Sequence, residues 1–178
     1  MKAIFLDRDG TIIKDKEYLK STEEIELLKG VLDALQILQN LGFKLIVISN
    51  QSGIGRGLIT KEQVEKTNNY LLDLLFCNGV NITEIYYCPH SPKDNCNCRK
   101  PCPKMVYEAI NKYEINKAES YFIGDKLIDA LTGLNAGIKA VLIDKDLKPV
   151  DHHENITVVA SLLSFAENLL DGSYLWLI

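Results

Sequence analysis

The sequence predicts an α/β protein with a doubly wound, mainly parallel sheet and helices on both faces. Short, continuous apolar runs suit parallel strands that are buried on both faces. Helical patterns alternate with these runs, which indicates right-handed βαβ units. The length of 178 residues lies in the range of about 100–200 residues that one domain commonly occupies. We therefore expect residues 1–178 to form a single domain.

Five apolar runs are expected to be strands. They are AIFLD at 3–7, KLIVIS at 44–49, EIYY at 84–87, SYFIG at 120–124 and KAVLI at 139–143. In doubly wound sheets, ligands bind outside the carboxyl ends of the strands, near the point where the strand order reverses. The residues that follow these runs are therefore the first candidates for function.

Five helices are expected between and after the strands, from the spacing of apolar residues and from start and stop signals. They lie around Val31, Leu35 and Leu38, with Gly42 as a stop; after a capping box of Thr60 and Gln63; around Met105, Val106, Ile110 and Tyr113; over Leu127 to Ala136; and over Val158 to Leu170.

The composition disfavours two classes of partner. Lys and Arg number 20 and Asp and Glu 24, so the net charge is −4. That charge gives no basic field for a nucleic-acid backbone or an anionic membrane. The amino terminus MKAIFLDRDG has too short an apolar run for a signal peptide or a membrane span. We expect a cytoplasmic protein, with a monomer favoured and neither nucleic acid nor membrane as partner.

Acidic and hydroxyl side chains follow three of the predicted strands. Asp7 and Asp9 end the first strand two residues apart, so both can face one reacting centre while the chain stays extended. Ser49 ends the second strand, and Asp125 follows the fourth, with Asp129 one helical turn later. A solvated turn would also explain the acidic pair taken alone. Acid, hydroxyl and acid at three junctions instead favour catalysis, with Mg²⁺ allowing Asp7 and Asp125 to lie beside a phosphate.

The sequence resembles the haloacid dehalogenase superfamily of phosphatases through DRDGT, SNQSG, the lysine of CRKP, and GDKLID. More closely, it resembles the heptose-1,7-bisphosphate 7-phosphatases and the related histidinol-phosphate phosphatases of that superfamily. The matching segments also include SNQSGIGRG and YYCPH, and they run in motif order from about Ala3 to Ile143. The resemblance implies a haloacid dehalogenase-like fold and a Mg²⁺-dependent phosphomonoesterase that acts on a small sugar phosphate.

The resemblance also implies roles for individual residues. Asp7 would be the nucleophile that becomes an aspartyl phosphate, and Asp9 the general acid and base. Ser49 and Lys100 would hold the phosphoryl oxygens, and Asp125 would bind Mg²⁺ together with Asp7 and the backbone carbonyl of Asp9.

Positions that would contact the substrate follow from the same resemblance. They are the segment Asp15 to Tyr18, with Asp15 and Tyr18 as its site residues, and Ser49, Asn50, Gln51, Ser52, Arg99, Lys100 and Lys126. Lys104 competes with Lys100 as the phosphate-binding lysine, but a surface helix start also commonly carries a lysine. Arg56, Arg99, Lys100 and Lys126 supply more positive charge than one phosphate with Mg²⁺ requires, which favours a bisphosphate substrate.

Four of the five cysteines lie between positions 88 and 102. The Cys₃His set of a closed tetrahedral zinc site is provided by Cys88, His90, Cys96 and Cys98. The resemblance agrees, because both groups of phosphatases that the sequence resembles carry a zinc loop of this kind. Free thiols are the alternative, but in an exposed loop they would be reactive. Because no ligand position stays open, we expect structural Zn²⁺. Cys102 is expected at a helix entry and Cys77 as a buried, inert thiol.

Two further segments give weaker signals. His152 and His153 lie in the acidic stretch PVDHHEN, where a solvated loop is favoured over a metal site. The apolar terminus GSYLWLI could pack on the domain or contact another chain.

Other functions remain open on the sequence alone. Histidinol-phosphate phosphatase is the nearest, although Ser52 stands where that group is more often acidic. A zinc-stabilised, non-catalytic binding module is a second alternative, but it would not need a nucleophile beside a proton donor. A true dehalogenase is less favoured, because two acids and a metal site suit a phosphate substrate and not an alkyl halide. Polynucleotide 3′-phosphatases share the DxDGT-type motif, but the chain has neither a basic face nor a second domain. Residues 12–30 and 53–60 leave no room for a cap domain, so we expect an open site.

Overall fold

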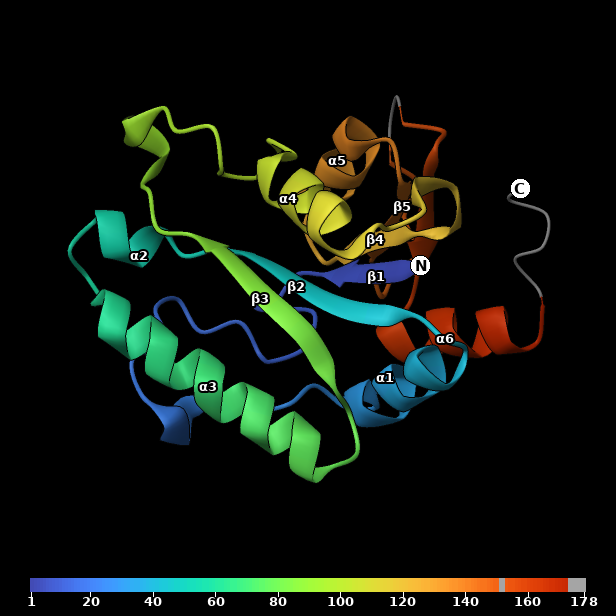
Figure 1. Cartoon of the computed structure of the whole chain (residues 1–178), viewed down its shortest axis with the longest axis horizontal. Helices are drawn as coiled ribbons and strands as arrows, with labels where there is room; N and C mark the ends of the chain where they lie inside the picture. The colour runs from blue at the N-terminus through green and yellow to red at the C-terminus, as the bar shows by residue number, and fades with distance from the viewer. Residues whose placement is uncertain (151–152, 173–178) are drawn as a thin grey trace.

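A parallel sheet forms the centre of the computed structural model, which describes residues 1–150 and 153–172. Its strand order is β3-β2-β1-β4-β5-β6, and every pairing is parallel (Figure 1). The strands are β1 Ala3–Leu6, β2 Lys44–Asn50, β3 Ile82–Cys88, β4 Tyr121–Gly124, β5 Lys139–Ile143 and β6 Ile156–Val159. The doubly wound parallel sheet that the sequence predicts is confirmed.

Helices cover both faces of this sheet. They are α1 Val31–Asn40, α2 Ser52–Gly55, α3 Lys61–Cys77, α4 Lys104–Tyr113, α5 Leu127–Ala136 and α6 Leu162–Leu170. The first, third and sixth helices lie on one face, and α4 and α5 lie on the other (Figure 1). None of the helices within residues 1–150 and 153–172 combines the length and the apolar character that a bilayer crossing requires.

The burial of β1 on both faces explains why its sequence is continuously apolar. Ile4 and Leu6 are fully buried in the core beneath α1, α3 and α6, whereas Ala3 and Phe5 are fully buried in the core beneath α4. Successive side chains of a strand point to opposite faces, so a strand between two helical layers needs apolar residues at every position.

The predicted helix signals at Thr60 and at Leu127 are confirmed. The Thr60 hydroxyl accepts a hydrogen bond from the Gln63 amide at 3.2 Å, and the Gln63 side chain accepts one from the Thr60 amide at 2.8 Å. The fifth helix spans Leu127–Ala136 as expected, and Gly137 ends it with a φ of 73°. That left-handed conformation suits glycine, which carries no Cβ.

The expected last helix over Val158 to Leu170 was wrong at its start. Ile156–Val159 forms the edge strand β6, which pairs with β5, and α6 begins only at Leu162. The run ITVV is rich in β-branched residues, which favour a pleated strand over a helix. Ser161 then caps the helix, because its hydroxyl accepts a hydrogen bond from the Ser164 amide at 3.0 Å.

The expectation of a buried Cys77 was also wrong. Cys77 is exposed at the last position of α3, next to Phe76, which is 71% exposed. Leu71 and Leu75 carry the buried face of this helix instead. The prediction failed because it rested on the apolar run as a whole, whereas a helix buries only one side of it.

The switch in strand direction positions the site. From β1 the chain winds outward to β2 and β3, and it then returns to β4 on the other side of β1. The carboxyl ends of β1, β2 and β4 therefore lie next to one another. Between β1 and α1 the chain forms a loop with one 3-10 turn, Thr22–Glu24, and no cap domain is present in the described residues.

Candidate active site

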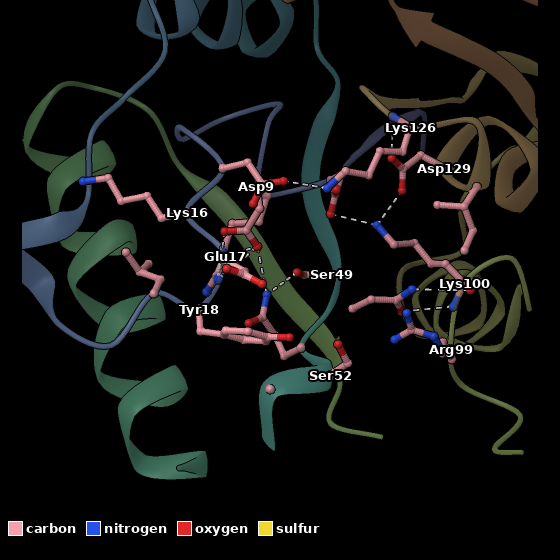
Figure 2. A pocket seen from close by; sticks show the side chains of 18 residues that line it. Asp9, Lys16, Glu17, Tyr18, Ser49, Ser52, Arg99, Lys100, Lys126 and Asp129 are labelled. Atoms are coloured by element: carbon pink, nitrogen blue, oxygen red, sulfur yellow. Dashed lines mark hydrogen bonds and ion pairs between the residues drawn. The ribbon is translucent and has the colours of Figure 1, made fainter. Parts of the chain in front are cut away.

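A pocket of about 280 Å³ opens at the carboxyl ends of β1, β2 and β4. Its lining includes all the predicted substrate-contacting residues, namely Asp15, Tyr18, Ser49, Asn50, Gln51, Ser52, Arg99, Lys100 and Lys126. Figure 2 shows Lys16, Glu17 and Tyr18 on one side of this pocket and Arg99, Lys100 and Asp129 on the other. Four separate loops thus meet at one hollow, as the switch point of the sheet requires.

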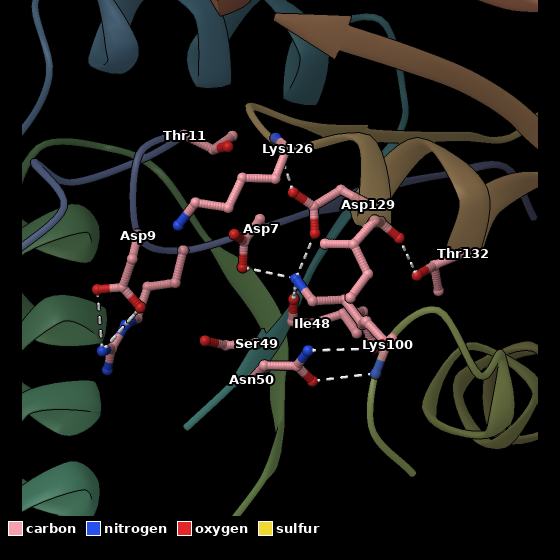
Figure 3. Close-up of polar contacts among 12 residues, drawn as sticks. Asp7, Asp9, Thr11, Ile48, Ser49, Asn50, Lys100, Lys126, Asp129 and Thr132 are labelled. Atoms are coloured by element: carbon pink, nitrogen blue, oxygen red, sulfur yellow. Dashed lines mark hydrogen bonds and ion pairs between the residues drawn. The ribbon is translucent and has the colours of Figure 1, made fainter. Parts of the chain in front are cut away.

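The Lys100 ammonium group is buried between two carboxylates. Its Nζ lies 2.7 Å from Asp7 Oδ1 and 2.6 Å from Asp129 Oδ1, and it donates to the Ile48 carbonyl at 2.8 Å (Figure 3). Burial, the largest effect, lowers the pKa of Lys100, but the two carboxylates outweigh it and raise that pKa above its usual value. Lys100 therefore stays charged beside Asp7.

Asn50 fixes the backbone of Lys100. The Lys100 amide donates to the Asn50 side-chain oxygen at 3.0 Å, and the Asn50 side-chain nitrogen donates to the Lys100 carbonyl at 3.3 Å (Figure 3). Lys104, the alternative lysine, lies at the exposed start of α4, with its Nζ 3.4 Å from Asn97 Oδ1. Only Lys100 of these two lines the pocket.

Asp9 is held at the pocket by three hydrogen bonds from two side chains, Arg8 and Gln51. Its Oδ2 accepts from Arg8 Nε at 3.1 Å and from Gln51 Nε2 at 2.9 Å, and its Oδ1 accepts from Arg8 Nη2 at 3.1 Å. Gln51 Nε2 also donates to the Ser49 hydroxyl at 2.6 Å. Burial raises the pKa of Asp9, with Arg8 opposing the rise and Asp7 adding to it. A raised pKa lets a carboxyl group carry a proton closer to neutral pH.

A group of three carboxylates could hold a divalent cation. Ligand oxygens of Asp7, Asp125 and Asp129 lie within 4.8 Å of one another. Burial and then the Asp7 charge raise the pKa of Asp125, and the same two effects raise that of Asp129 to about 6 against the opposing Lys100. A bound cation would offset the repulsion among these carboxylates. Carboxylate oxygens are also the hard ligands that Mg²⁺ prefers, so the group suits Mg²⁺.

Gly10 lets Asp125 approach the first loop. Gly10 has a φ of 89°, and a Cβ at this position would lie 2.2 Å from Asp125 Oδ2. The Thr11 hydroxyl donates to Asp125 Oδ1 at 3.4 Å. The glycine of DRDGT is therefore required both for its left-handed backbone and for the space that the carboxylate occupies.

The predicted zinc ligands lie together at the end of β3, which supplies Cys88, and in the loop that follows it. Cys98 Sγ lies 2.9 Å from Cys88 Sγ and 3.6 Å from Cys96 Sγ, and His90 Nδ1 lies 3.2 Å from Cys98 Sγ. A tetrahedron with zinc–sulfur bonds of about 2.3 Å has edges of roughly 3.8 Å. The four ligand atoms lie within 4.8 Å of one another, some of them closer than this edge, and three thiols and one imidazole are a donor set compatible with Zn²⁺. Cys102 stays outside the group and donates to the Asn97 carbonyl at 2.6 Å.

The Cys₃His loop is bonded directly to the loop after β2. The Gln51 amide donates to the Cys88 carbonyl at 2.8 Å, and the Gly55 amide donates to the Pro89 carbonyl at 2.8 Å. A Cβ on Gly55 would lie 2.5 Å from the Ser91 nitrogen, so the two loops pack closely. The fold of this loop therefore supports both Gln51 and the segment that leads to Arg99 and Lys100.

Sequence reasoning did not assign three residues that the structure places at the site. Asp129 was noted as one turn beyond Asp125, but its ion pair with Lys100 was not expected. Arg8 and Asn68 were not considered, although they form a hydrogen bond at 2.7 Å behind Asp9. A capping box that pairs the Lys126 amide with Asp129 Oδ2 at 3.1 Å was the available signal for Asp129.

Two other predictions concern the end of the chain. His153 is half-buried in a loop, where its amide donates to the Val150 carbonyl at 3.2 Å, and it belongs to no metal-ligating group among the described residues. His152 lies outside the described residues, and so does residue range 173–178 of the apolar terminus.

Comparison with known proteins identifies the class. The family model described as polynucleotide kinase 3 phosphatase matches residues 2–154. The chain belongs to this family of haloacid dehalogenase-like phosphatases. It is 45% identical over 150 residues to a Helicobacter pylori protein named D-glycero-beta-D-manno-heptose-1,7-bisphosphate 7-phosphatase, an alignment that covers 83% of this chain and 87% of the relative.

Two further comparisons agree with that relationship. An Escherichia coli K12 protein of the same name is 39% identical over 155 residues, which cover 83% of this chain and 81% of the relative. The crystal structure of D,D-heptose 1.7-bisphosphate phosphatase from B. bronchiseptica, complexed with magnesium and phosphate, superposes with a TM-score of 0.89. Its sequence is 32% identical, and the match covers 97% of this chain and 99% of that one.

Proposed function

We propose that this phosphatase removes the 7-phosphate of D-glycero-D-manno-heptose 1,7-bisphosphate through an aspartyl phosphate on Asp7. The observation that carries the mechanism is the Asp7 carboxylate in the pocket, 2.7 Å from the buried Lys100 ammonium and two residues from the proton-donating candidate Asp9. The substrate is proposed from the names of the relatives, which cover more than four-fifths of this chain at 39–45% identity.

In the first step, an oxygen of Asp7 attacks the phosphorus atom. The bond between phosphorus and the sugar oxygen breaks, and Asp9 gives its proton to that oxygen as the alcohol leaves. Lys100 and the Ser49 hydroxyl offset the charge on the transferred phosphoryl oxygens, because positioning and electrostatics supply most of the catalysis in phosphoryl transfer.

In the second step, water attacks the phosphorus atom of the aspartyl phosphate. Asp9, now ionised, takes the proton of that water, and the bond between phosphorus and the Asp7 oxygen breaks. Inorganic phosphate leaves, and both carboxyl groups return to their starting states. Gln51 supports both steps by holding Asp9 and Ser49 through one amide nitrogen.

Two metals are proposed for this chain. Asp7, Asp125 and the backbone carbonyl of Asp9 would hold Mg²⁺, which when bound supplies positive charge to the phosphate and lowers repulsion from the carboxylates. Asp129 lies in the same carboxylate group, but its ion pair with Lys100 suits a supporting role. Cys88, His90, Cys96 and Cys98 would hold a structural Zn²⁺ ion with no open position.

A bisphosphate suits the cations around the pocket. Arg99 lines it, and its Nη1 is buried with no hydrogen-bond partner among residues 1–150 and 153–172. A guanidinium group can grip a second phosphate in bidentate fashion and satisfy such an atom. Lys126, also in the lining, forms an ion pair with Asp15 at 2.7 Å that a phosphate could replace.

A phosphate-release assay with Mg²⁺ tests the substrate. The purified protein is compared on heptose 1,7-bisphosphate, the matching monophosphate, histidinol phosphate and a 3′-phosphorylated oligonucleotide. We expect the highest kcat/KM on the bisphosphate. A clear preference for histidinol phosphate would assign that activity instead, and a preference for the oligonucleotide would agree with the description of the family model and contradict a sugar substrate.

A further inference from the structure

A buried arginine lies directly behind the proposed proton donor. The Arg8 side chain is only 2% exposed, whereas Asp9 keeps 17% exposure and lines the pocket. Arg8 Nε and Nη2 reach different oxygens of Asp9, each at 3.1 Å. This two-point contact fixes both the position of the carboxylate and the rotation of its plane, which a single hydrogen bond would leave free.

Asn68 of α3 holds the arginine from behind. Arg8 Nη1 donates to Asn68 Oδ1 at 2.7 Å, and Asn68 is 6% exposed. The two residues are sixty positions apart in the chain, so the contact ties the loop after β1 to α3, which packs in the same core as that loop. The guanidinium is therefore gripped on both sides, by the acid in front and the amide behind.

Stability alone does not account for this arrangement. A buried guanidinium loses its hydration, and an apolar side chain of similar volume commonly packs as well or better at a buried ion-pair position. At the neighbouring buried position on α3, the Thr67 hydroxyl donates to the Val64 carbonyl of its own helix at 3.0 Å.

We propose that Arg8 and Asn68 are positioning residues that aim the Asp9 carboxyl group at the leaving oxygen of the substrate. The proposal rests on the proposed function, since it takes Asp9 to be the general acid. Arg8 acts through Asp9 and does not itself transfer a proton. Losing either residue should impair departure of the alcohol more than it impairs attack by Asp7.

The test compares two substrates that differ in their need for an acid. A sugar phosphate must expel a poor alkoxide leaving group, whereas p-nitrophenyl phosphate expels a stable phenolate with little need for protonation. The measured quantity is kcat/KM, because it reports steps up to departure of the first product. The variants are Arg8→Lys, which keeps the charge but loses the fork, Asn68→Ala, and Thr67→Ala as the matched control on α3.

Arg8→Lys should lower kcat/KM about tenfold or more on heptose 1,7-bisphosphate and less than about threefold on p-nitrophenyl phosphate. A misaimed general acid loses part of the roughly 10²–10⁴-fold that such a group contributes. Asn68→Ala should show a smaller difference of the same sign, and Thr67→Ala should show none. Should Arg8→Lys fail to fold, Asn68→Ala decides the question alone. Equal losses on the two substrates in the folded variants would overturn the proposal.

A double-mutant cycle separates positioning from a purely structural role. In an Asp9→Asn background, Arg8→Lys should cause little further loss, because effects of residues that act as a unit are not additive. Additive losses would contradict the proposal. If Asp9→Asn itself reduced both substrates equally, the acid role of Asp9 would fail and the proposal with it. If only Asp9→Asn discriminated, the proposed function would stand and the positioning role would fall.

Discussion

Replacing Lys100 with methionine should destabilise the protein in a pH-dependent way. The ammonium group lies 2.7 Å from Asp7 and 2.6 Å from Asp129, and the Asp129 side chain is fully buried. Methionine keeps much of the volume and removes the charge, so two buried carboxylates lose their partner. Breaking a buried ion pair in this way typically costs about 3–5 kcal/mol.

The sign of the pH dependence follows from the carboxylates. Burial and Asp7 raise the pKa of Asp129 from 3.8 to about 6 even with Lys100 present. Since the raised pKa belongs to the folded state, ionising Asp129 opposes folding, and stability falls as the pH rises through that interval. Lys100 itself has a raised pKa, so its stabilising contribution is present at both pH 5 and pH 8 in the native protein. Without Lys100 the carboxylates must ionise unpaired at pH 8, whereas at pH 5 protonation relieves them.

The assay is thermal unfolding, followed by circular dichroism in Mg²⁺-free buffer at pH 5 and pH 8. A loss of about 3 kcal/mol corresponds to roughly 6–12 °C in Tm for a chain of this size, and we expect it at pH 8 with a clearly smaller loss at pH 5. Lys104→Met is the matched control, because its side chain is 47% exposed and its ion pair with Glu108 measures 3.9 Å. That control should change Tm little at either pH. An equal loss for Lys100→Met at both pH values would refute the electrostatic reasoning.

Three further predictions concern metals and substrate. Cys98→Ser should lower the zinc content and Tm together. If elemental analysis finds no zinc in native protein that was prepared with zinc and kept reduced, the structural zinc site is contradicted. Gly10→Ala should weaken the response of activity to Mg²⁺, because its Cβ would displace the Asp125 carboxylate; an unchanged Mg²⁺ titration would argue against Asp125 as a ligand. Arg99→Ala should raise KM for the bisphosphate more than it lowers kcat, and an unaltered ratio of bisphosphate to monophosphate efficiency would remove the second-phosphate role.

Local patterns were enough to predict most of the fold. The capping box at Thr60 and the bounds of Leu127–Ala136 could be read from sequence because the signals lie within a few residues of the elements they define. The edge strand at Ile156–Val159 was missed because its apolar residues also continue the pattern of the following helix. Its pairing with β5 is a long-range contact that no local pattern states.

The site likewise has a part that could be predicted from the sequence and a part that could not. Asp9, Ser49 and Gln51 could be placed at strand ends, but the single amide that joins Gln51 to both others depends on side-chain geometry. Arg8 lay inside the recognised DRDGT motif, and yet its partner Asn68 lies sixty positions later in the chain, on the helix α3 between β2 and β3. Spacing indicates which residues can meet at a strand end, whereas contacts between layers emerge only from packing.

The central claim is that Asp7 carries the phosphoryl group during turnover, and acid-quenched mass spectrometry tests it most directly. The native protein with Mg²⁺ is mixed with heptose 1,7-bisphosphate, quenched within milliseconds and digested under acid. We predict a transient phosphoryl adduct on the peptide that contains Asp7, absent from Asp7→Asn, with phosphate release lost in that variant. Rapid phosphate release by Asp7→Asn, or an adduct on a different residue, would contradict the account.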